Sequence, residues 1–186
     1  MDSLNVLLND NLEPKLSEFR LSMKIEATQR HHSFHVDKVW DMEGQGYTDP
    51  TYTETKIVSH KSDIYSFGIV MFELLCGRKA VINDDQDNKY LAPMAILHYR
   101  EEKLEDIVEW NLSKQIDPQS FKVFTEIAYD CLNEEPSQRP NIDDIVPKLE
   151  KALKFARQNR PVRPLFFSLP SFYHNLLEYL VNVGSI

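Results

Sequence analysis

The chain has 186 residues and a formal net charge of −8, with 42% hydrophobic and 27% charged residues. This is an ordinary globular composition, which excludes a disordered tail, a collagen-like repeat and a disulfide-stapled miniprotein. The acidic balance argues against nucleic acid as a partner, because nucleic-acid-binding surfaces are basic. The sequence contains no apolar run of 18 residues and no signal peptide pattern. It therefore predicts a cytoplasmic protein without a transmembrane segment.

The first 56 residues predict one small β-hairpin followed by a long loop. Residues 4–8 form a short apolar, β-prone run, residues 9–11 interrupt it, and residues 15–19 alternate weakly between apolar and polar. This pattern is typical of a hairpin. Residues 22–56 are polar and lack a period, so we expect them to form a loop, and loops of that length are usually functional or disordered.

The middle of the chain predicts a buried helix. Residues 63–76 are apolar almost all round, and a helix that is apolar on every face belongs in a core. Ser59 or Ser62 is a suitable N-cap, and Gly77 stands where a glycine commonly ends a helix. This helix is expected to form the centre of the domain.

Three amphipathic helices are expected to follow. One covers residues 91–101, one is capped by Ser120, and the last is capped by Asn141 and has apolar residues every three or four positions. Pro147 falls inside the last helix, where it removes one backbone hydrogen bond and is expected to bend the axis.

The end of the chain predicts a linker and a short helix. Residues 159–170 contain three prolines, and residues 171–183 can form an amphipathic helix. That helix either packs back on the chain's own lobe or docks on a partner or a membrane surface, and the lack of Lys and Arg in it argues against anionic lipid. Two cysteines, Cys76 and Cys131, lie far apart within apolar helical patterns and are expected to be buried, reduced thiols.

Four motifs of the chain resemble motifs of protein kinases, and they occur in the same order along the sequence. Residues 61–68, Lys-Ser-Asp-Ile-Tyr-Ser-Phe-Gly, are similar to the signature of the kinase central helix in its plant receptor-like form. Residues 46–50 resemble the end of the activation loop, and residues 138–140 resemble the closing Gln-Arg-Pro motif. Residues 4–21 resemble the stretch from the catalytic-loop Asn through the metal-binding motif. The chain thus resembles the plant receptor-like Ser/Thr kinases, and most closely the FERONIA-like group.

The resemblance implies a fold and a division of the chain. We expect a mainly α, kinase-like C-terminal lobe with a small β-hairpin at its N-terminus and without the small N-terminal lobe. Residues 1–157 would form this partial kinase-like domain, and residues 158–186 a linker with a C-terminal amphipathic helix. The resemblance also assigns structural roles to Asp63 and Arg139.

The resemblance implies Mg-ATP-dependent phosphorylation of Ser/Thr for the family, yet the matched catalytic residues are incomplete. The catalytic Asp would lie five residues before Asn5, ahead of the chain, and Asp2 stands where the family has Lys. The metal-binding Asp-Phe-Gly motif reads Glu18-Phe19-Arg20. Asn5 and Glu18 are therefore degenerate Mg-ATP positions, and we expect no catalytic residue, no metal site and no bound cofactor.

Two further substitutions lie near the expected site. Gly44 replaces a Thr or Ser, and Thr51 replaces the Glu that pairs with the motif Arg in the family, so Arg139 loses that partner. A buried guanidinium without an anion is costly. We expect Asp49 or Glu54 to substitute in part, and Thr51→Glu to stabilise the chain.

Two functional classes follow from these residues. The first is a pseudokinase-like module that binds proteins, with other kinases as a candidate class. Its apolar face near residues 4–8 and Leu16 would be uncovered, and we expect either self-association through this face or packing of the 171–183 helix over it. The alternative is a fragment or incomplete gene model of an active ATP-dependent protein Ser/Thr kinase. Truncation cannot produce the substituted motifs, which favours the first class. A decaying gene copy without function is a third reading.

Overall fold

The structure is a computed structural model of the chain. It describes residues 3–9, 14–17, 22, 26, 32–36, 46–82 and 89–158. The predicted linker at 159–170 and the predicted helix at 171–183 lie outside these residues. None of the helices in the described part of the chain has the length and hydropathy needed to cross a bilayer.

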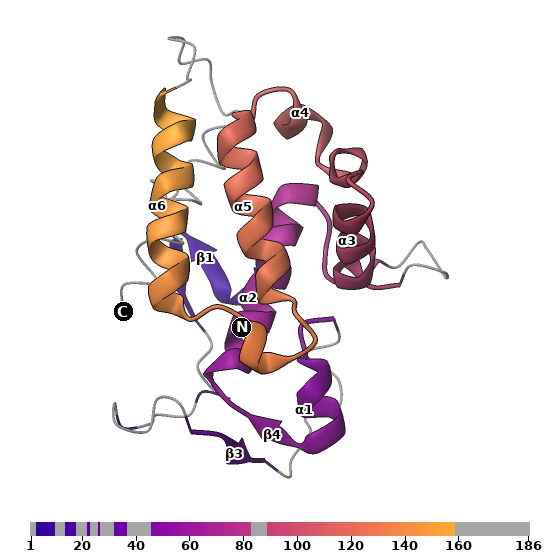
Figure 1. Cartoon of the computed structure of the whole chain (residues 1–186), viewed down its shortest axis with the longest axis vertical. Helices are drawn as coiled ribbons and strands as arrows, with labels where there is room; N and C mark the ends of the chain where they lie inside the picture. Colours follow the sequence, from indigo (N-terminus) through magenta and orange to yellow (C-terminus); the bar gives the residue numbers. More distant parts are fainter. Residues whose placement is uncertain are drawn as a thin grey trace.

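Helices dominate the fold, and two short strand pairs accompany them (Figure 1). The strands are β1 (Val6–Leu8), β2 (Pro14–Leu16), β3 (Phe34–His35) and β4 (Ile57–Val58). The helices are α1 (Pro50–Thr55), α2 (His60–Cys76), α3 (Leu91–Arg100), α4 (Trp110–Ser113), α5 (Pro118–Cys131) and α6 (Ile142–Gln158), with 3-10 turns η1 (Ser3–Asn5), η4 (Leu104–Ile107) and η5 (Pro136–Gln138). The prediction of a mainly α lobe with an N-terminal hairpin is confirmed.

The N-terminal hairpin is antiparallel, with Val6 opposite Leu16. The expectation of a loop over residues 22–56 is wrong in part, because this stretch contains α1 and β3. α1 begins at Pro50 because the Asp49 side chain accepts the N–H of Thr51, and proline at the first helical position has no N–H to satisfy. β4 then pairs antiparallel with β3.

Helix α2 forms the centre of the core, as predicted. Ile69, Met71, Phe72 and Leu75 are fully buried on different sides of it. Ser59 caps the helix through a reciprocal capping box with Ser62, and Gly77 ends it in the left-handed conformation, with φ 63°. Both termini therefore follow the local signals of the sequence.

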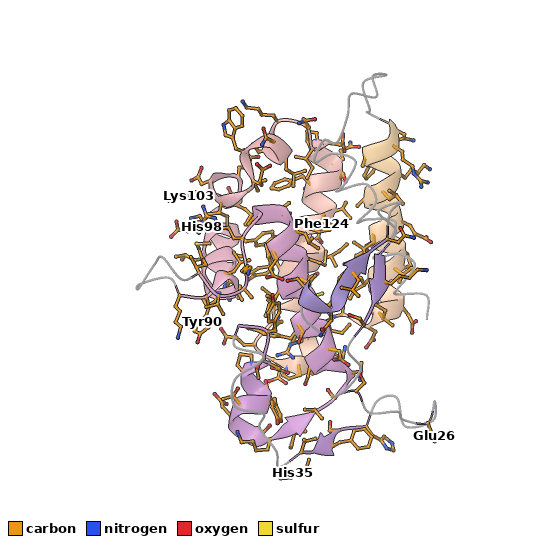
Figure 2. The ribbon with its side chains drawn as sticks, turned by 180° about the vertical axis from the view of Figure 1, so that it is seen from behind. Glu26, His35, Tyr90, His98, Lys103 and Phe124 are labelled. Atoms are coloured by element: carbon orange, nitrogen blue, oxygen red, sulfur yellow. The ribbon has the colours of Figure 1, made fainter. Side chains whose placement is uncertain are left out.

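Helices α5 and α6 pack against each other, and α5 also packs on α2 (Figure 1). Figure 2 shows Phe124 of α5 in the interior of the helical lobe, where its ring is fully buried, and Lys103 at the surface. Ser120 is not the cap of α5, contrary to the prediction. Asp117 caps it by accepting the N–H of Ser120, and this serine lies buried in the first turn.

Helix α6 begins directly after Asn141, as predicted. The side-chain oxygen of Asn141 faces His60 at 3.4 Å, and the carboxylate of Asp144 accepts the backbone N–H of Asn141. Pro147 lies within the helix, which continues to Gln158.

The two cysteines are free and buried, as predicted. Burial raises the pKa of Cys76 to about 12, and burial also raises the pKa of Cys131. Both therefore stay protonated thiols at neutral pH.

Gly68 allows α2 and α5 to approach closely, and its substitution tests this contact. A Cβ at Gly68 would lie 2.7 Å from the Cβ of Cys131 and 3.1 Å from the carbonyl oxygen of Ala128. We expect Gly68→Ala to lower the free energy of unfolding by about 1–3 kcal/mol, the usual cost of overpacking. The measurement is urea unfolding followed by circular dichroism. In a helix with free space the same change stabilises by up to about 1 kcal/mol, so a gain in stability would contradict the close contact.

Candidate functional site

The hairpin carries the one predicted Mg-ATP residue that the structure describes. Asn5 is half-buried at the end of η1, and its backbone carbonyl accepts the N–H and the hydroxyl of Ser17 at 2.8 and 3.2 Å. Ser17 is the residue before Glu18 in the chain, and Glu18 itself lies outside the described residues, as do Arg20 and Gly44. The pairing of β1 with β2 thus holds Asn5 beside the start of the metal-binding motif.

Two oxygen-bearing side chains match the metal-binding positions, Asn5 and Glu18, and the structure describes only the first of them. Mg²⁺ requires octahedral oxygen ligands, chiefly carboxylates and waters. Asn5 offers one neutral amide, and the motif supplies a longer Glu with an Arg two residues later. Within the described ranges no group of three His, Cys, Asp or Glu side chains could hold a metal ion.

A hydrogen-bonded network links the hairpin, the residues before α1, and α2. The hydroxyl of Tyr47 donates to Oε1 of Glu73 and lies 3.0 Å from Oγ of Ser3. Oε1 of Glu73 also accepts the N–H of Ala80 at 2.8 Å, and Ser66 donates to the Tyr47 carbonyl at 2.9 Å. Burial, together with the hydrogen bond to Glu73, raises the pKa of Tyr47, so its hydroxyl stays protonated.

Sequence reasoning missed this network, although one signal was present. Glu73 stands inside the otherwise apolar run of α2, and its side chain is buried. A buried carboxylate needs hydrogen-bond donors. The position of Glu73 therefore predicted a donor, but it did not identify Tyr47 as that donor.

Arg139 is buried with a full set of acceptors. Its guanidinium forms a bidentate pair with Asp49, with Nη1–Oδ2 and Nη2–Oδ1 distances of 2.7 and 2.9 Å. The remaining N–H groups donate to the carbonyls of Asn133, Lys61 and Glu134. All five N–H donors of the guanidinium are used. The side chain also lies over the ring of Tyr65, at 4.9 Å from its centroid.

Asp49 provides the carboxylate that Arg139 was expected to need. It caps α1 and pairs with Arg139 at the same time. Glu54, the other candidate, is exposed. Burial alone would raise the pKa of Asp49. Arg139 lowers it through its hydrogen bonds and its positive charge, and hydrogen bonds from Ser62 and Thr51 lower it further, so this pKa lies below its usual value.

The two residues assigned structural roles differ in their surroundings. Arg139 is 2% exposed. Asp63 is exposed in the first turn of α2, where a negative charge complements the helix dipole. Lys61, beside it, donates to the carbonyls of Arg139 and Pro140 and so ties the start of α2 to the turn before α6.

The Asp49–Arg139 pair predicts a large effect for a small change. Asp49→Asn keeps a residue that caps helices well but leaves Arg139 charged and buried without an anion. We expect the free energy of unfolding to fall by about 3–5 kcal/mol. Thr51→Glu should bring no gain, because Arg139 has no N–H left to donate, and this replaces the stabilisation expected from sequence. Chemical unfolding measures both variants, and a clear gain for Thr51→Glu would contradict the complete pairing.

The same pair also sets a pH dependence. The pKa of Asp49 is lower in the folded chain than in the unfolded chain, so the pair stabilises the fold above the ordinary Asp pKa of about 4. This stabilisation is lost as the pH falls through the lowered pKa. Asp49→Asn should therefore show a flatter stability curve below about pH 4 than the unmodified chain, and parallel curves would argue against the pair as the cause.

Comparison with known proteins identifies the family. The family described as protein tyrosine and serine/threonine kinase matches residues 1–149. The receptor-like protein kinase FERONIA of Arabidopsis thaliana is 38% identical over 153 residues, which is 81% of this chain and 16% of that protein. The receptor-like protein kinase ANXUR2 of the same plant is 36% identical over 152 residues, 81% of this chain and 17% of that protein. The chain spans about one sixth of these relatives, and it belongs to the protein kinase family, with plant receptor-like kinases among its relatives.

Proposed function

We propose that the chain is a non-catalytic protein-binding module built on the C-terminal lobe of a receptor-like kinase. The observation that carries the proposal is a contrast between two sets of positions. The first set lies in the core of the lobe, where every N–H of the buried Arg139 has an acceptor. The second set consists of the substituted positions in the matched motifs, and it includes the metal-binding motif, which reads Glu18-Phe19-Arg20.

The contrast supports binding over catalysis for a physical reason. Phosphoryl transfer depends on positioning and on electrostatic stabilisation by metal ions at the phosphates. A longer carboxylate and a nearby cation weaken both. The contrast also argues against a decaying gene copy, because the loss of Glu at position 51 is offset by Asp49.

The surface supports protein partners. Trp110 at the start of α4 is 66% exposed, and Leu97 on α3 is 52% exposed. The two helices follow one another along one side of the lobe (Figure 1). Exposed tryptophan is enriched among the residues that dominate binding energy at protein interfaces. We propose that this side binds another kinase, and that receptor-like kinases are the first class to test.

The same proposal includes self-association through the hairpin. Leu7 of the hairpin is 55% exposed, whereas Val6 is half-buried against the core. The side chains of Leu4, Leu8 and Leu16, the other members of the predicted apolar face, lie outside the described set.

An active kinase is the alternative, and one observation favours it. The chain covers only 16–18% of the length of its relatives. If it is a piece of a longer kinase, the remaining catalytic residues would lie in the rest of that protein. In that case the longer protein would use Mg-ATP, and Asn5 would be a retained ligand.

A phosphotransfer assay separates the two functions. The chain is incubated with radiolabelled ATP, Mg²⁺ and generic protein substrates, next to a Glu18→Ala control. We expect no incorporation above the control and no rise in the unfolding temperature with Mg-ATP, because a ligand that binds the folded state raises that temperature. Mg²⁺-dependent incorporation that is lost in Glu18→Ala would overturn the non-catalytic proposal.

A binding measurement tests the partner class. Isothermal titration of the chain with the kinase domain of a receptor-like kinase such as FERONIA should give saturable binding, which Trp110→Ala weakens at least about tenfold. Ile57→Ala, at an exposed apolar residue of β4, is the matched control and should bind as the unmodified chain does. The absence of binding, or equal binding by Trp110→Ala, would contradict the assigned surface.

A further inference from the structure

We propose that the C-terminal segment, residues 159–186, folds back and inserts apolar side chains into the groove between α5 and α6. This contact would be intramolecular and independent of the function proposed above. Three observations carry it: the shape of the groove, the composition of the segment, and the point at which the segment leaves the lobe.

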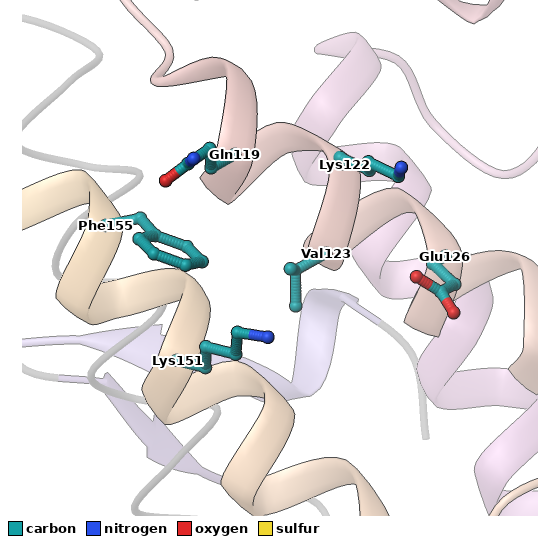
Figure 3. A pocket seen from close by; sticks show the side chains of 6 residues that line it. All are labelled: Gln119, Lys122, Val123, Glu126, Lys151 and Phe155. Carbon is teal, nitrogen blue, oxygen red and sulfur yellow. The ribbon is translucent and has the colours of Figure 1, made fainter.

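The groove is small and apolar at its centre (Figure 3). Val123 of α5 and Phe155 of α6 are half-buried in it, whereas Lys122, Glu126 and Lys151 are exposed around it. Its volume is about 290 Å³, at the lower limit of about 300–1,000 Å³ for small-molecule sites. The charges at its rim are of both signs. This shape suits a few apolar side chains of a polypeptide better than a metabolite.

The segment of residues 159–186 is rich in hydrophobic residues and poor in charged ones. Of its 28 residues, 14 are hydrophobic and 3 are charged, which is 50% and about 11%, against 42% and 27% for the whole chain. Apolar surface of this extent is unfavourable in water. If residues 171–183 form the predicted helix, one face presents apolar residues at helical spacing, and such a face needs a surface to pack on. The residues are Phe172, Leu176, Leu177, Leu180 and Val181.

The segment begins beside the groove. α6 ends at Gln158, three residues after Phe155, which is about 4.5 Å along a helix axis. The 12 residues of the linker at 159–170 reach up to roughly 37 Å when extended. A helix over 171–183 would be about 20 Å long, so the linker is long enough to turn back and lay it along α5 and α6.

Tethering favours this occupant over a partner in solution. A segment joined by a short linker has an effective concentration in the millimolar range at a neighbouring surface. Even weak apolar contacts then suffice for docking within one chain. A second copy of the chain would have to compete against this concentration.

The test places a spin label at the groove in the full chain. Gln119 is exposed at the groove, and Gln119→Cys can carry the label because the native Cys76 and Cys131 are buried. The matched control is Glu54→Cys on α1, which lies at the opposite end of the lobe from the start of α5 (Figure 1). NMR then measures the loss of amide signal in residues 165–186. We expect strong loss with the label at position 119 and little with the label at position 54.

A second pair of variants tests the groove itself. Phe155→Glu should abolish the signal loss caused by the label at position 119, whereas Lys154→Glu, at the exposed neighbouring position, should leave it unchanged. If Phe155→Glu fails to fold, the comparison of the two labels decides alone. Equal signal loss from both labels, or none from position 119, would overturn the proposal. Signal loss of the same size when labelled chains are mixed with separate isotope-enriched chains would assign the groove to a second copy and would overturn it as well.

Discussion

The buried guanidinium of Arg139 sets the arrangement of the part of the lobe that holds α1. Arginine cannot lose its proton in a protein, so its charge must be met wherever it is buried. Asp49 supplies the carboxylate from the start of α1, Lys61 a carbonyl from the start of α2, and two more carbonyls come from the turn after α5. The starts of α1 and α2 are thereby tied to a side chain that lies 78 to 90 positions later in the sequence. The orientation of α1 against α2 depends on this cluster.

The carboxylate that pairs with Arg139 comes from Asp49 and not from position 51. The motif Glu is replaced by Thr51, yet Asp49, two residues earlier, both caps α1 and pairs with Arg139. A residue needed for the cap therefore also stabilises the cluster. The lobe therefore has a buried ion pair at Arg139 although position 51 offers no carboxylate.

Helix α2 connects this cluster to the hairpin. Its N-terminal turn contacts Arg139 through the carbonyl of Lys61, and three turns later Glu73 accepts the hydroxyl of Tyr47, which lies beside Ser3. The residues around Asn5 are thus held by the same helix that contacts Tyr47, in the stretch that resembles the end of the activation loop. Helix α2 therefore fixes the positions of both the hairpin and the residues before α1.

The sequence by itself determined the elements whose signals are local. The apolar run, Ser59 and Gly77 predicted α2, and alternation predicted the hairpin, because period and capping are properties of neighbouring residues. It did not determine α1, the pairing of β3 with β4, or the cap of α5, where Asp117-Pro118 overrides Ser120. Only the tertiary structure decided between Asp49 and Glu54 as the partner of Arg139, and only it showed that Tyr47 meets Glu73. Such pairs leave no periodic trace in a sequence, since their partners are chosen by how α1, α2 and α5 pack.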